Sequence, residues 1–575
     1  MDPAARSQQP AGHLPPVALT RSARAGAAAA SALFLTVLVN WSWQLQPPRY
    51  TSEFYDIQAR RLFHGHLSVP LDRIGLEAFR HGDAYHLYFG MFPTLLRMPI
   101  LLVTDRFDGR LTQPSMLGAW VVLLVALRGL AWHTRILVRG NVSEVAVDRA
   151  DRVIAFVVPL LAAAATPVLF LASVTAVYHE AILWGLASSL WAFDRLLVVL
   201  IAPTRRAVWW FGAAATIAMT SRASVGLAPC AAAGIAAALS LLPNVRALPR
   251  AFRRSTTRLG AHLDIGALDA RIAVGLAIAA LVPVAAHVAV NEARFGTALS
   301  PPYASQVWTE LSADRRAALS ANDGSLFNAR YVPSTVLAYL RPDGAEITRL
   351  FPYVWFDPPA RVVGDVVFDT RDRTASLTAL SPALVALSAF GLVAVARALR
   401  RRRALARLTI PVATSTVAVF GVLTIGFIAQ RYEGDLLVPG TLLALTGLYA
   451  VVDRVAARGV SLRFRRAAVA IAAMSLAWSV WANLSVALLY QRLYVPVREA
   501  DRHGFVEIQF TMQRALPGSI VFAQSESSPT DLAAAGAFHV TGACGALWWS
   551  DGTMWIQLEP LPSGTSPLCR RLVEQ

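Results

Sequence analysis

Residues 270–291 read ARIAVGLAIAALVPVAAHVAVN, a run of 22 residues whose only charged side chain, Arg271, stands at its start. A helix of about 20 apolar residues is long enough to cross the ~30 Å hydrocarbon core of a bilayer. Runs of this kind recur along most of the chain, and we count eleven: 26–45, 114–134, 153–173, 181–201, 207–221, 223–242, 270–291, 380–396, 408–428, 435–452 and 467–489. The sequence therefore predicts a mainly α fold, a polytopic bundle of transmembrane helices.

The composition of the chain excludes two other classes of protein. Of the 575 residues, 55% are hydrophobic and 15% are charged, whereas a soluble domain is about 25% charged. The formal net charge of +17 comes from arginines that lie in short clusters between the apolar runs. This is the pattern of positive cytoplasmic loops in a membrane protein. We therefore predict neither a soluble globular protein nor one that binds nucleic acid.

The arginine clusters also predict how the bundle is oriented in the plasma membrane. Three connecting segments carry five, six and five arginines: 246–258, 397–407 and 454–466. A cytoplasmic N-terminal tail over 1–25 places all three in the cytoplasm when the spans are counted in order. The expected transmembrane domain then covers 26–489 and carries two large outer loops, 46–113 and 292–379. An extracytoplasmic C-terminal domain is expected over 490–575.

The C-terminal segment differs in character from the rest. Short alternating stretches such as 519–522, and turn signals such as Ser550-Asp551-Gly552, predict a small β-rich or α/β domain. Cys544 and Cys569 both lie in this segment. If it faces an oxidising compartment, we expect the two cysteines to form a disulfide.

The first outer loop contains two closely spaced acids. Residues 47–67 read PPRYTSEFYDIQARRLFHGHL, and a helix is expected from Ser52 onward, with Ser52 as its N-cap. Glu53 and Asp56 are three residues apart, so both side chains fall on one helix face. Two crowded carboxylates form a candidate acid/base site, because like charges raise the pKa of one of them. The alternative is that Glu53 caps the helix and Asp56 pairs with Arg60.

Several segments together resemble a known family. The first span leads into a loop with an early acid, a Gly65-His66-Leu67 turn and the sequence YFGMFPTLLRMP over 88–99. Further on, 291–299 reads NEARFGTAL and 430–435 reads QRYEGD. In this layout the chain looks like the GT-C glycosyltransferases of bacteria, polytopic enzymes that use polyprenyl-phosphate-linked sugars.

The resemblance implies an essential acid in the first outer loop, soon after the first span. Asp56 best matches that position, and Glu53 is the second choice. Such an enzyme must also hold the phosphate of its donor, which arginines do through charge-assisted hydrogen bonds. We expect Arg431 with Tyr432, and Arg222 in an outer turn, to bind the donor phosphate. The alternative is that these arginines only extend to the membrane surface.

Three more residues are candidates for the acceptor or for a metal. His179 and Glu180 stand at the outer end of a span, where they could bind an acceptor sugar or a divalent metal, or could simply cap and pack. Tyr88 could stack on a sugar ring, with an interfacial aromatic belt as the alternative. The four histidines of 46–113 match no standard zinc spacing, so a divalent metal is possible but no structural metal site is predicted.

These observations predict a membrane glycosyltransferase of inverting type, a hexosyl- or pentosyltransferase. Its donor is a polyprenyl-phosphate sugar, and its acceptor is a cell-envelope glycan or glycolipid bound outside with the help of 490–575. No nucleotide-binding glycine loop is visible in the cytoplasmic segments, which agrees with a lipid-linked donor. The alternative is a transporter or flippase for a lipid-linked sugar, which would place charge or broken helices at the membrane midplane. A non-catalytic envelope scaffold is a third hypothesis.

Overall fold

The computed structural model describes residues 16–43, 50–140, 146–265, 268–348, 350–457 and 459–494, together with short pieces between 504 and 560. The chain divides into two compact units. One comprises Met1–Gly344 and Pro358–Asn483, and the other comprises Ala345–Asp357 and Leu484–Gln575.

All eleven apolar runs form helices, which confirms the mainly α fold: α1 (Val17–Leu38), α5 (Thr112–Arg139), α6 (Arg149–Ala164), α8 (Val177–Ile201), α9 (Arg205–Ser221), α10 (Ala223–Leu241), α12 (Ala270–Phe295), α17 (Pro382–Arg401), α18 (Thr409–Leu423), α19 (Glu433–Ala456) and α20 (Leu462–Leu489). Within the described part of the chain, eight of them are long and apolar enough to cross a bilayer: α5, α8, α10, α12, α17, α18, α19 and α20. The chain is therefore a multi-pass membrane protein. Because α6 and α9 have only 16 and 17 residues, the count of eleven spans stays a prediction.

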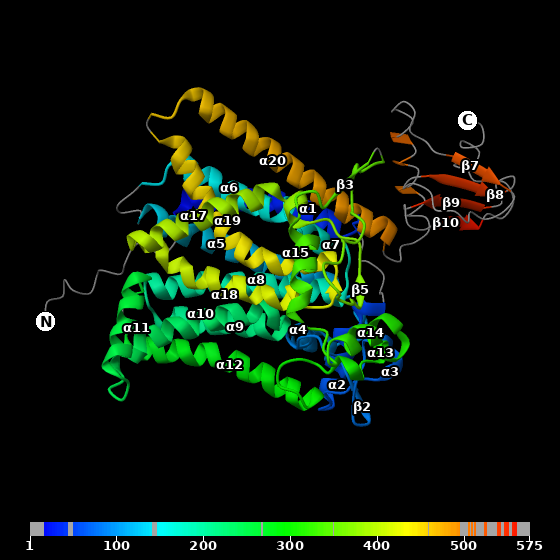
Figure 1. The fold of residues 1–575 in the computed structure, drawn as a ribbon, viewed down its shortest axis with the longest axis horizontal. Helices are drawn as coiled ribbons and strands as arrows, with labels where there is room; N and C mark the ends of the chain where they lie inside the picture. The colour runs from blue at the N-terminus through cyan, green and yellow to red at the C-terminus, as the bar shows by residue number, and fades with distance from the viewer. Residues whose placement is uncertain are drawn as a thin grey trace. The chain divides into compact units, whose positions relative to one another are not determined.

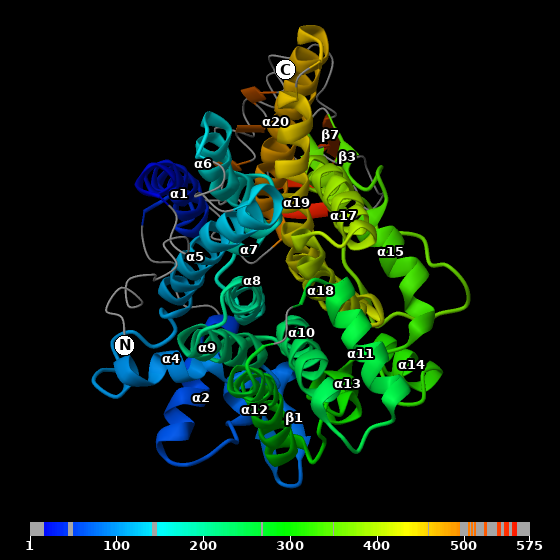
Figure 2. The same cartoon turned by 90° about the vertical axis from the view of Figure 1, so that its left-hand side faces the viewer.

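Helix α8 is the centre of the bundle. It packs against α5, α9 and α10, and the end-on view in Figure 2 shows these helices around it. In its most apolar window 83% of the residues are buried. Gly185 allows a neighbour to approach closely, since a methyl group there would stand 2.7 Å from Cβ of Arg222. Because α8 is packed between these neighbours, the side chains at its ends have well-defined positions.

The two long loops of the first unit gather at one end of the bundle. Figure 1 shows α2, α3, α13, α14 and β2 at that end and the arginine-rich α11 at the opposite end. The shorter elements of this unit are α2 (Phe54–Phe63), α3 (Leu71–Ile74), η3 (Gly75–Glu77), β1 (Phe79–His81), β2 (Ala84–His86), α4 (Phe92–Leu101), α7 (Val168–Ala172), α11 (Arg250–His262), α13 (Val307–Leu311), α14 (Ala313–Ala321), α15 (Val332–Leu340), β5 (Thr370–Arg371), α16 (Leu377–Leu380), β6 (Phe427–Ile428) and η8 (Gln430–Tyr432). This separation agrees with both long loops lying on one side of a membrane.

Two of the predicted runs differ from the observed helices in ways that the local backbone explains. α1 ends at Leu38 rather than near residue 45, because Asn40, Trp41 and Trp43 have positive φ angles of 54°, 60° and 55°, which interrupt a right-handed helix. The run 153–173 is divided into α6 and α7. The division falls before Pro167, where proline disfavours a helical conformation of the residue that precedes it.

The second unit contains a four-stranded sheet. Its strands are β7 (Phe522–Ser525), β8 (Phe538–Thr541), β9 (Ala546–Ser550) and β10 (Trp555–Pro560), in the order β10-β9-β8-β7. β7 and β8 run parallel, and the other neighbours run antiparallel. A small hairpin of β3 (Glu346–Ile347) and β4 (Val354–Trp355) belongs to the same unit. Cys544 and Cys569 lie outside the described residues, so their disulfide and the domain limit at 490 stay predictions.

Candidate active site

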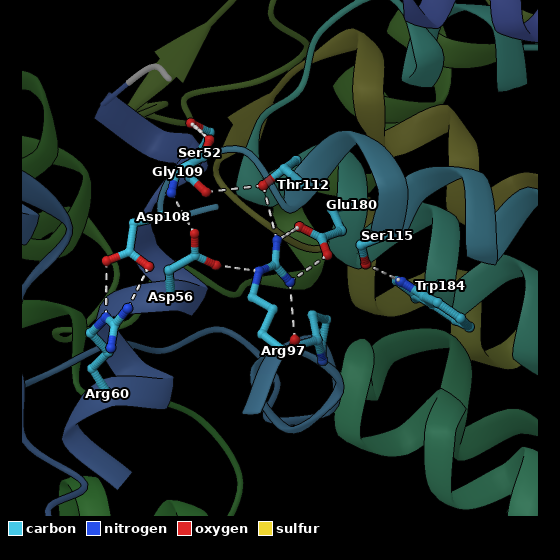
Figure 3. A network of polar contacts seen from close by, with 11 residues as sticks. Ser52, Asp56, Arg60, Arg97, Asp108, Gly109, Thr112, Ser115, Glu180 and Trp184 are labelled. Atoms are coloured by element: carbon cyan, nitrogen blue, oxygen red, sulfur yellow. Dashed lines mark hydrogen bonds and ion pairs between the residues drawn. The ribbon is translucent and has the colours of Figure 1, made fainter. Parts of the chain in front are cut away.

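A buried triad of charges joins the loop 46–113 to the central helix (Figure 3). Arg97 donates from Nη1 and Nη2 to the two carboxylate oxygens of Glu180, at 2.8 and 2.7 Å. Its Nε lies 2.5 Å from Oδ1 of Asp56. The side chains of Asp56, Arg97 and Glu180 are 3%, 1% and 0% exposed. The forked guanidinium thus binds one carboxylate through two atoms and the second through its third nitrogen.

Each member of the triad is placed by its own element. Asp56 lies in the first turn of α2, and Arg97 lies in the middle of α4, which starts with Pro93 in its first turn. Proline there is preorganised for a helix and lacks only an N–H that has no intrahelical partner. Glu180 lies in the first turn of α8, where its negative charge is favoured by the helix dipole.

Neighbouring polar groups complete the surroundings of the triad. The N–H of Gly109 donates to Oδ2 of Asp56 at 2.6 Å. Gly109 has a φ of 72°, a conformation that favours glycine. The hydroxyl of Thr112 accepts from Arg97 at 2.9 Å and donates to the carbonyl of Ser52 at 3.0 Å. Both oxygens of Asp56 are therefore engaged by protein groups.

Burial raises the pKa of Asp56 to about 6, while the charge of Arg97 and the N–H of Gly109 oppose this shift. A carboxylate with a pKa near 6 can exchange a proton close to neutral pH, as a general base must. The position of Asp56 favours a structural role instead, because a substrate hydroxyl could reach its carboxylate only after Arg97 had moved.

The two acids predicted to act together do not share one environment. Glu53 is partly exposed and pairs with Arg73 at 3.0 Å. It occupies the N-cap of α2 without a side-chain hydrogen bond. The predicted cap by Ser52 is wrong, because the hydroxyl of Ser52 donates to the carbonyl of Gly109. The alternative pairing of Asp56 is wrong as well.

Arg60 pairs with Asp108 instead, at 2.8 Å. Both residues of this pair are partly exposed, and Figure 3 shows them beside the triad. The carboxylate of Asp56 thus pairs with Arg97, 41 residues further along the chain. It does not pair with Arg60, one helical turn away.

A second cluster lies around the predicted phosphate-binding arginine. The guanidinium of Arg431 lies over the rings of Tyr178, Tyr432 and Phe427, with its central carbon 4.9, 5.1 and 5.2 Å from their centroids. Three rings hold the cation by attraction to their π faces. Arg431, Tyr178 and Tyr432 are only partly buried. The cage therefore leaves an approach to the cation.

Tyr178 also connects Arg431 to Glu77, an acid of the loop 46–113. The hydroxyl of Tyr178 donates to Oε1 of Glu77, and the hydroxyl of Tyr88 also hydrogen-bonds this carboxylate. Nε2 of Gln306 approaches Oε2 of Glu77 at 3.4 Å. Burial raises the pKa of Glu77 above its usual range, and the charges of Arg431 and Arg315 oppose the rise.

Arg222 is bound differently from Arg431. Its Nε donates to Oδ1 of Asp435 at 2.6 Å, and Ser224 donates to Oδ2 at 3.0 Å. The guanidinium lies 5.5 Å from the ring centroid of Tyr432. The structure therefore brings the predicted Arg222, Arg431 and Tyr432 together, but the charge of Arg222 is already balanced by an acid.

His179 and Glu180 do not form one binding site. The ring of His179 is buried and contacts the carbonyl of Leu171 through Nδ1 at 3.1 Å, whereas Glu180 binds Arg97. Among the residues that the structure describes, no group of three or more histidines, cysteines and acids is placed to hold a metal ion. Tyr88 is half-buried and stacks at 4.2 Å on Phe89.

Three residues of these clusters were not predicted as site residues. Arg97 has a signal in the sequence, since a lone arginine within a short apolar run usually has a buried partner or a function. Tyr178 directly precedes His179 and Glu180, but nothing in its local sequence indicates the contact with Arg431. Glu77 has no local signal, because its partners come from distant parts of the chain.

No family model matches this chain, and no curated protein is similar to it in sequence. Two solved structures are similar in fold, both of the oligosaccharyltransferase of Archaeoglobus fulgidus. The apo form has a TM-score of 0.45, and the complex with an inhibitory peptide and a dolichol-phosphate has a TM-score of 0.40. Each is 14% identical over 87% of this chain, which spans 62% of the archaeal one.

Proposed function

We propose that this protein is an inverting GT-C-type glycosyltransferase that uses a polyprenyl-phosphate sugar and glycosylates a cell-envelope glycan or glycolipid outside. The observation that carries this proposal is the aromatic cage of Arg431 beside the carboxylate of Glu77, at the end of the bundle where both long loops gather. Glycosyl transfer from a phosphate requires a cation that stabilises the leaving phosphate and an acidic side chain that takes a proton from the acceptor.

In this proposal Arg431 binds the donor phosphate. A guanidinium forms paired hydrogen bonds with phosphate oxygens and stays charged at all relevant pH values. The rings of Tyr178, Tyr432 and Phe427 fix its position. Arg222 supports the cage by lying over Tyr432, and its own charge is offset by Asp435.

The acceptor hydroxyl must lose a proton as it attacks the anomeric carbon, and a carboxylate is suited to take it. Asp56 is the first candidate from the sequence, and its pKa of about 6 suits the task. It would have to release Arg97 to meet a substrate. In the described arrangement Asp56 keeps Arg97 and Glu180 in place, and Glu53 lies apart from it beside Arg73.

A transfer assay with purified protein tests the proposal. Labelled polyprenyl-phosphate hexoses and pentoses are incubated with the protein and a cell-envelope extract, and glycosylated product is measured. Product formed by the wild type supports the enzyme. If labelled lipid crosses the bilayer of a proteoliposome and no acceptor is ever glycosylated, the transporter hypothesis replaces it.

Replacing the phosphate-binding residue sharpens this test. Arg431→Ala should weaken binding of polyprenyl phosphate about 10- to 100-fold, because a charge-assisted contact contributes roughly 1.5–3 kcal/mol. The matched control is Arg330→Ala, an exposed arginine of the second outer loop, which should bind like the wild type. Equal affinity of the Arg431→Ala and Arg330→Ala proteins would remove Arg431 from the donor site.

A further inference from the structure

We infer that Glu77 is a catalytic residue, the base that takes the proton from the acceptor hydroxyl. This inference rests on the proposed glycosyl transfer and assigns the base within the same site. The geometry that points to it is a single side chain, Tyr178, which contacts the phosphate-binding arginine with its ring and the carboxylate of Glu77 with its hydroxyl.

The first step of the argument is the position of Glu77 relative to Arg431. The guanidinium lies 4.9 Å from the ring centroid of Tyr178, and the hydroxyl of the same ring donates to Oε1 of Glu77. One rigid side chain therefore holds both groups, the cation over the face of its ring and the carboxylate at its hydroxyl. A base must stand near the anomeric carbon, and that carbon is bonded to the phosphate that Arg431 would bind.

The second step is the kind of partner that Glu77 has. It accepts from the neutral groups of Tyr178, Tyr88 and Gln306. Within the described residues, no arginine lies within ion-pair distance of it. Asp56 differs, since Nε of Arg97 stands 2.5 Å away. Neutral donors and an arginine both lower the proton affinity of a carboxylate, but a carboxylate without a bound arginine can meet a substrate hydroxyl without first breaking an ion pair.

The other carboxylates near Arg431 are occupied or stand apart. Asp369 is buried and binds Arg315 at 2.6 Å, and Asp435 is buried and binds Arg222 at 2.6 Å. Asp372 has an exposed side chain, and burial of its carboxyl group among neighbouring atoms raises its pKa while the charge of Arg431 opposes the rise. Glu433 also accepts from a neutral donor, Nε2 of Gln430 at 2.7 Å, but it is completely buried. Glu77 is the one of these carboxylates that is half-buried and ordered by neutral donors.

The surroundings of Glu77 give it a higher proton affinity than an exposed glutamate has. Burial raises its pKa, and four neighbours oppose the rise: the hydroxyls of Tyr178 and Tyr88 and the charges of Arg431 and Arg315. A base acts best when its pKa lies near the working pH. When the donor phosphate binds, it adds negative charge beside Arg431, which raises the proton affinity of Glu77 as the reaction begins.

The proposed step is balanced as follows. The carboxylate of Glu77 takes the proton of the acceptor hydroxyl, and the oxygen of that hydroxyl forms a bond to the anomeric carbon. The bond between that carbon and the phosphate oxygen breaks, and its electron pair stays on the polyprenyl phosphate, next to Arg431. The proton on Glu77 then leaves to solvent, so that the products are the glycoside and the lipid phosphate.

Glu77→Gln tests the role directly, because the amide keeps the shape of the side chain but takes no proton at neutral pH. Turnover should fall by roughly 10²–10⁴-fold, while binding of polyprenyl phosphate stays equal or tightens, since a negative charge near the phosphate is removed. Glu310→Gln, at an exposed glutamate of the second outer loop, is the matched control and should retain turnover.

Tyr178→Phe separates catalysis from structural support. It removes the hydroxyl that lowers the pKa of Glu77 and keeps the ring on Arg431. The rate rises with pH as the base ionises, so this change should move the acid limb of the pH–rate profile to higher pH. Phosphate affinity should not change.

The outcomes separate the base from the proposed function itself. If the Glu77→Gln protein transfers sugar at the rate of the wild type, the assignment of Glu77 as the base is overturned. The proposal that the protein is a glycosyltransferase then still stands. Transfer that is lost in Asp372→Asn and kept in Glu77→Gln gives the role to Asp372. Loss of both turnover and phosphate binding in Glu77→Gln shows structural support only. Wild-type protein that transfers no sugar from any donor of the panel overturns both proposals.

Discussion

At the scale of single residues, Asp56 and Glu77 show how partners decide what a carboxylate can do. Both lie in the loop 46–113, and burial raises the pKa of each. Asp56 is bound by a guanidinium, which makes it part of the structure. Glu77 is bound by two hydroxyls and an amide, so no ion pair has to break before it accepts a proton from a substrate.

This difference gives a prediction for Asp56→Asn. If Asp56 mainly holds Arg97, the change should lower the free energy of unfolding by roughly 1–3 kcal/mol and reduce turnover less than Glu77→Gln does. Thermal unfolding in detergent and the transfer assay measure the two effects. Glu53→Gln, at the partly exposed pair with Arg73, should change little. Unchanged stability with a loss of turnover beyond about 10²-fold would return the role of base to Asp56.

The pKa of Asp56 predicts a pH dependence of stability. It is about 6 in the folded protein against an ordinary 3.8, so the folded state binds the proton more tightly than the unfolded chain. Raising the pH from about 3 to 7 should therefore remove stability, by roughly 3 kcal/mol at this site. Comparing unfolding of wild type and Asp56→Asn across this range isolates the effect. A difference between them that does not change with pH contradicts the assignment.

At the scale of elements, Arg97 connects α2, α4 and α8. Arg97→Ala leaves the carboxylates of Asp56 and Glu180 buried without a cation, which should cost about 3–5 kcal/mol. Arg73→Ala, which breaks the partly exposed pair with Glu53, should cost no more than about 1 kcal/mol. Thermal unfolding of the two variants in one detergent compares them, and equal losses would show that burial of the triad is unimportant.

Elements could be predicted to the extent that local sequence determines them. Apolar runs specify helices because the bilayer leaves the backbone no other partner, and every predicted run forms one. The bounds of α1 depend instead on the turn at Asn40, Trp41 and Trp43, for which the sequence carries no glycine or proline as a signal. The contacts of the site were harder still. Arg97 and Glu180 are 83 residues apart, and Glu77 and Tyr178 are 101 apart.

At the scale of the whole molecule, the arrangement of the first unit predicts a topology. Single cysteines introduced in 310–340 should react with an impermeant reagent in intact cells, and those in 248–256 only after the membrane is opened. The reason is that the first range belongs to the end of the bundle with the long loops, and the second belongs to the arginine-rich end. Labelling of 248–256 in intact cells would place the proposed site in the cytoplasm.

The buried triad also restricts how this protein can change over generations. Asp56, Arg97 and Glu180 are encoded far apart, yet loss of Arg97 leaves two buried carboxylates without a cation, and loss of either acid leaves part of a buried guanidinium without an acceptor. A lineage can lose the set only by replacing all three members in close succession. Among descendants of this chain we therefore expect these three positions to covary as a set, while Glu53 and Arg73 drift independently.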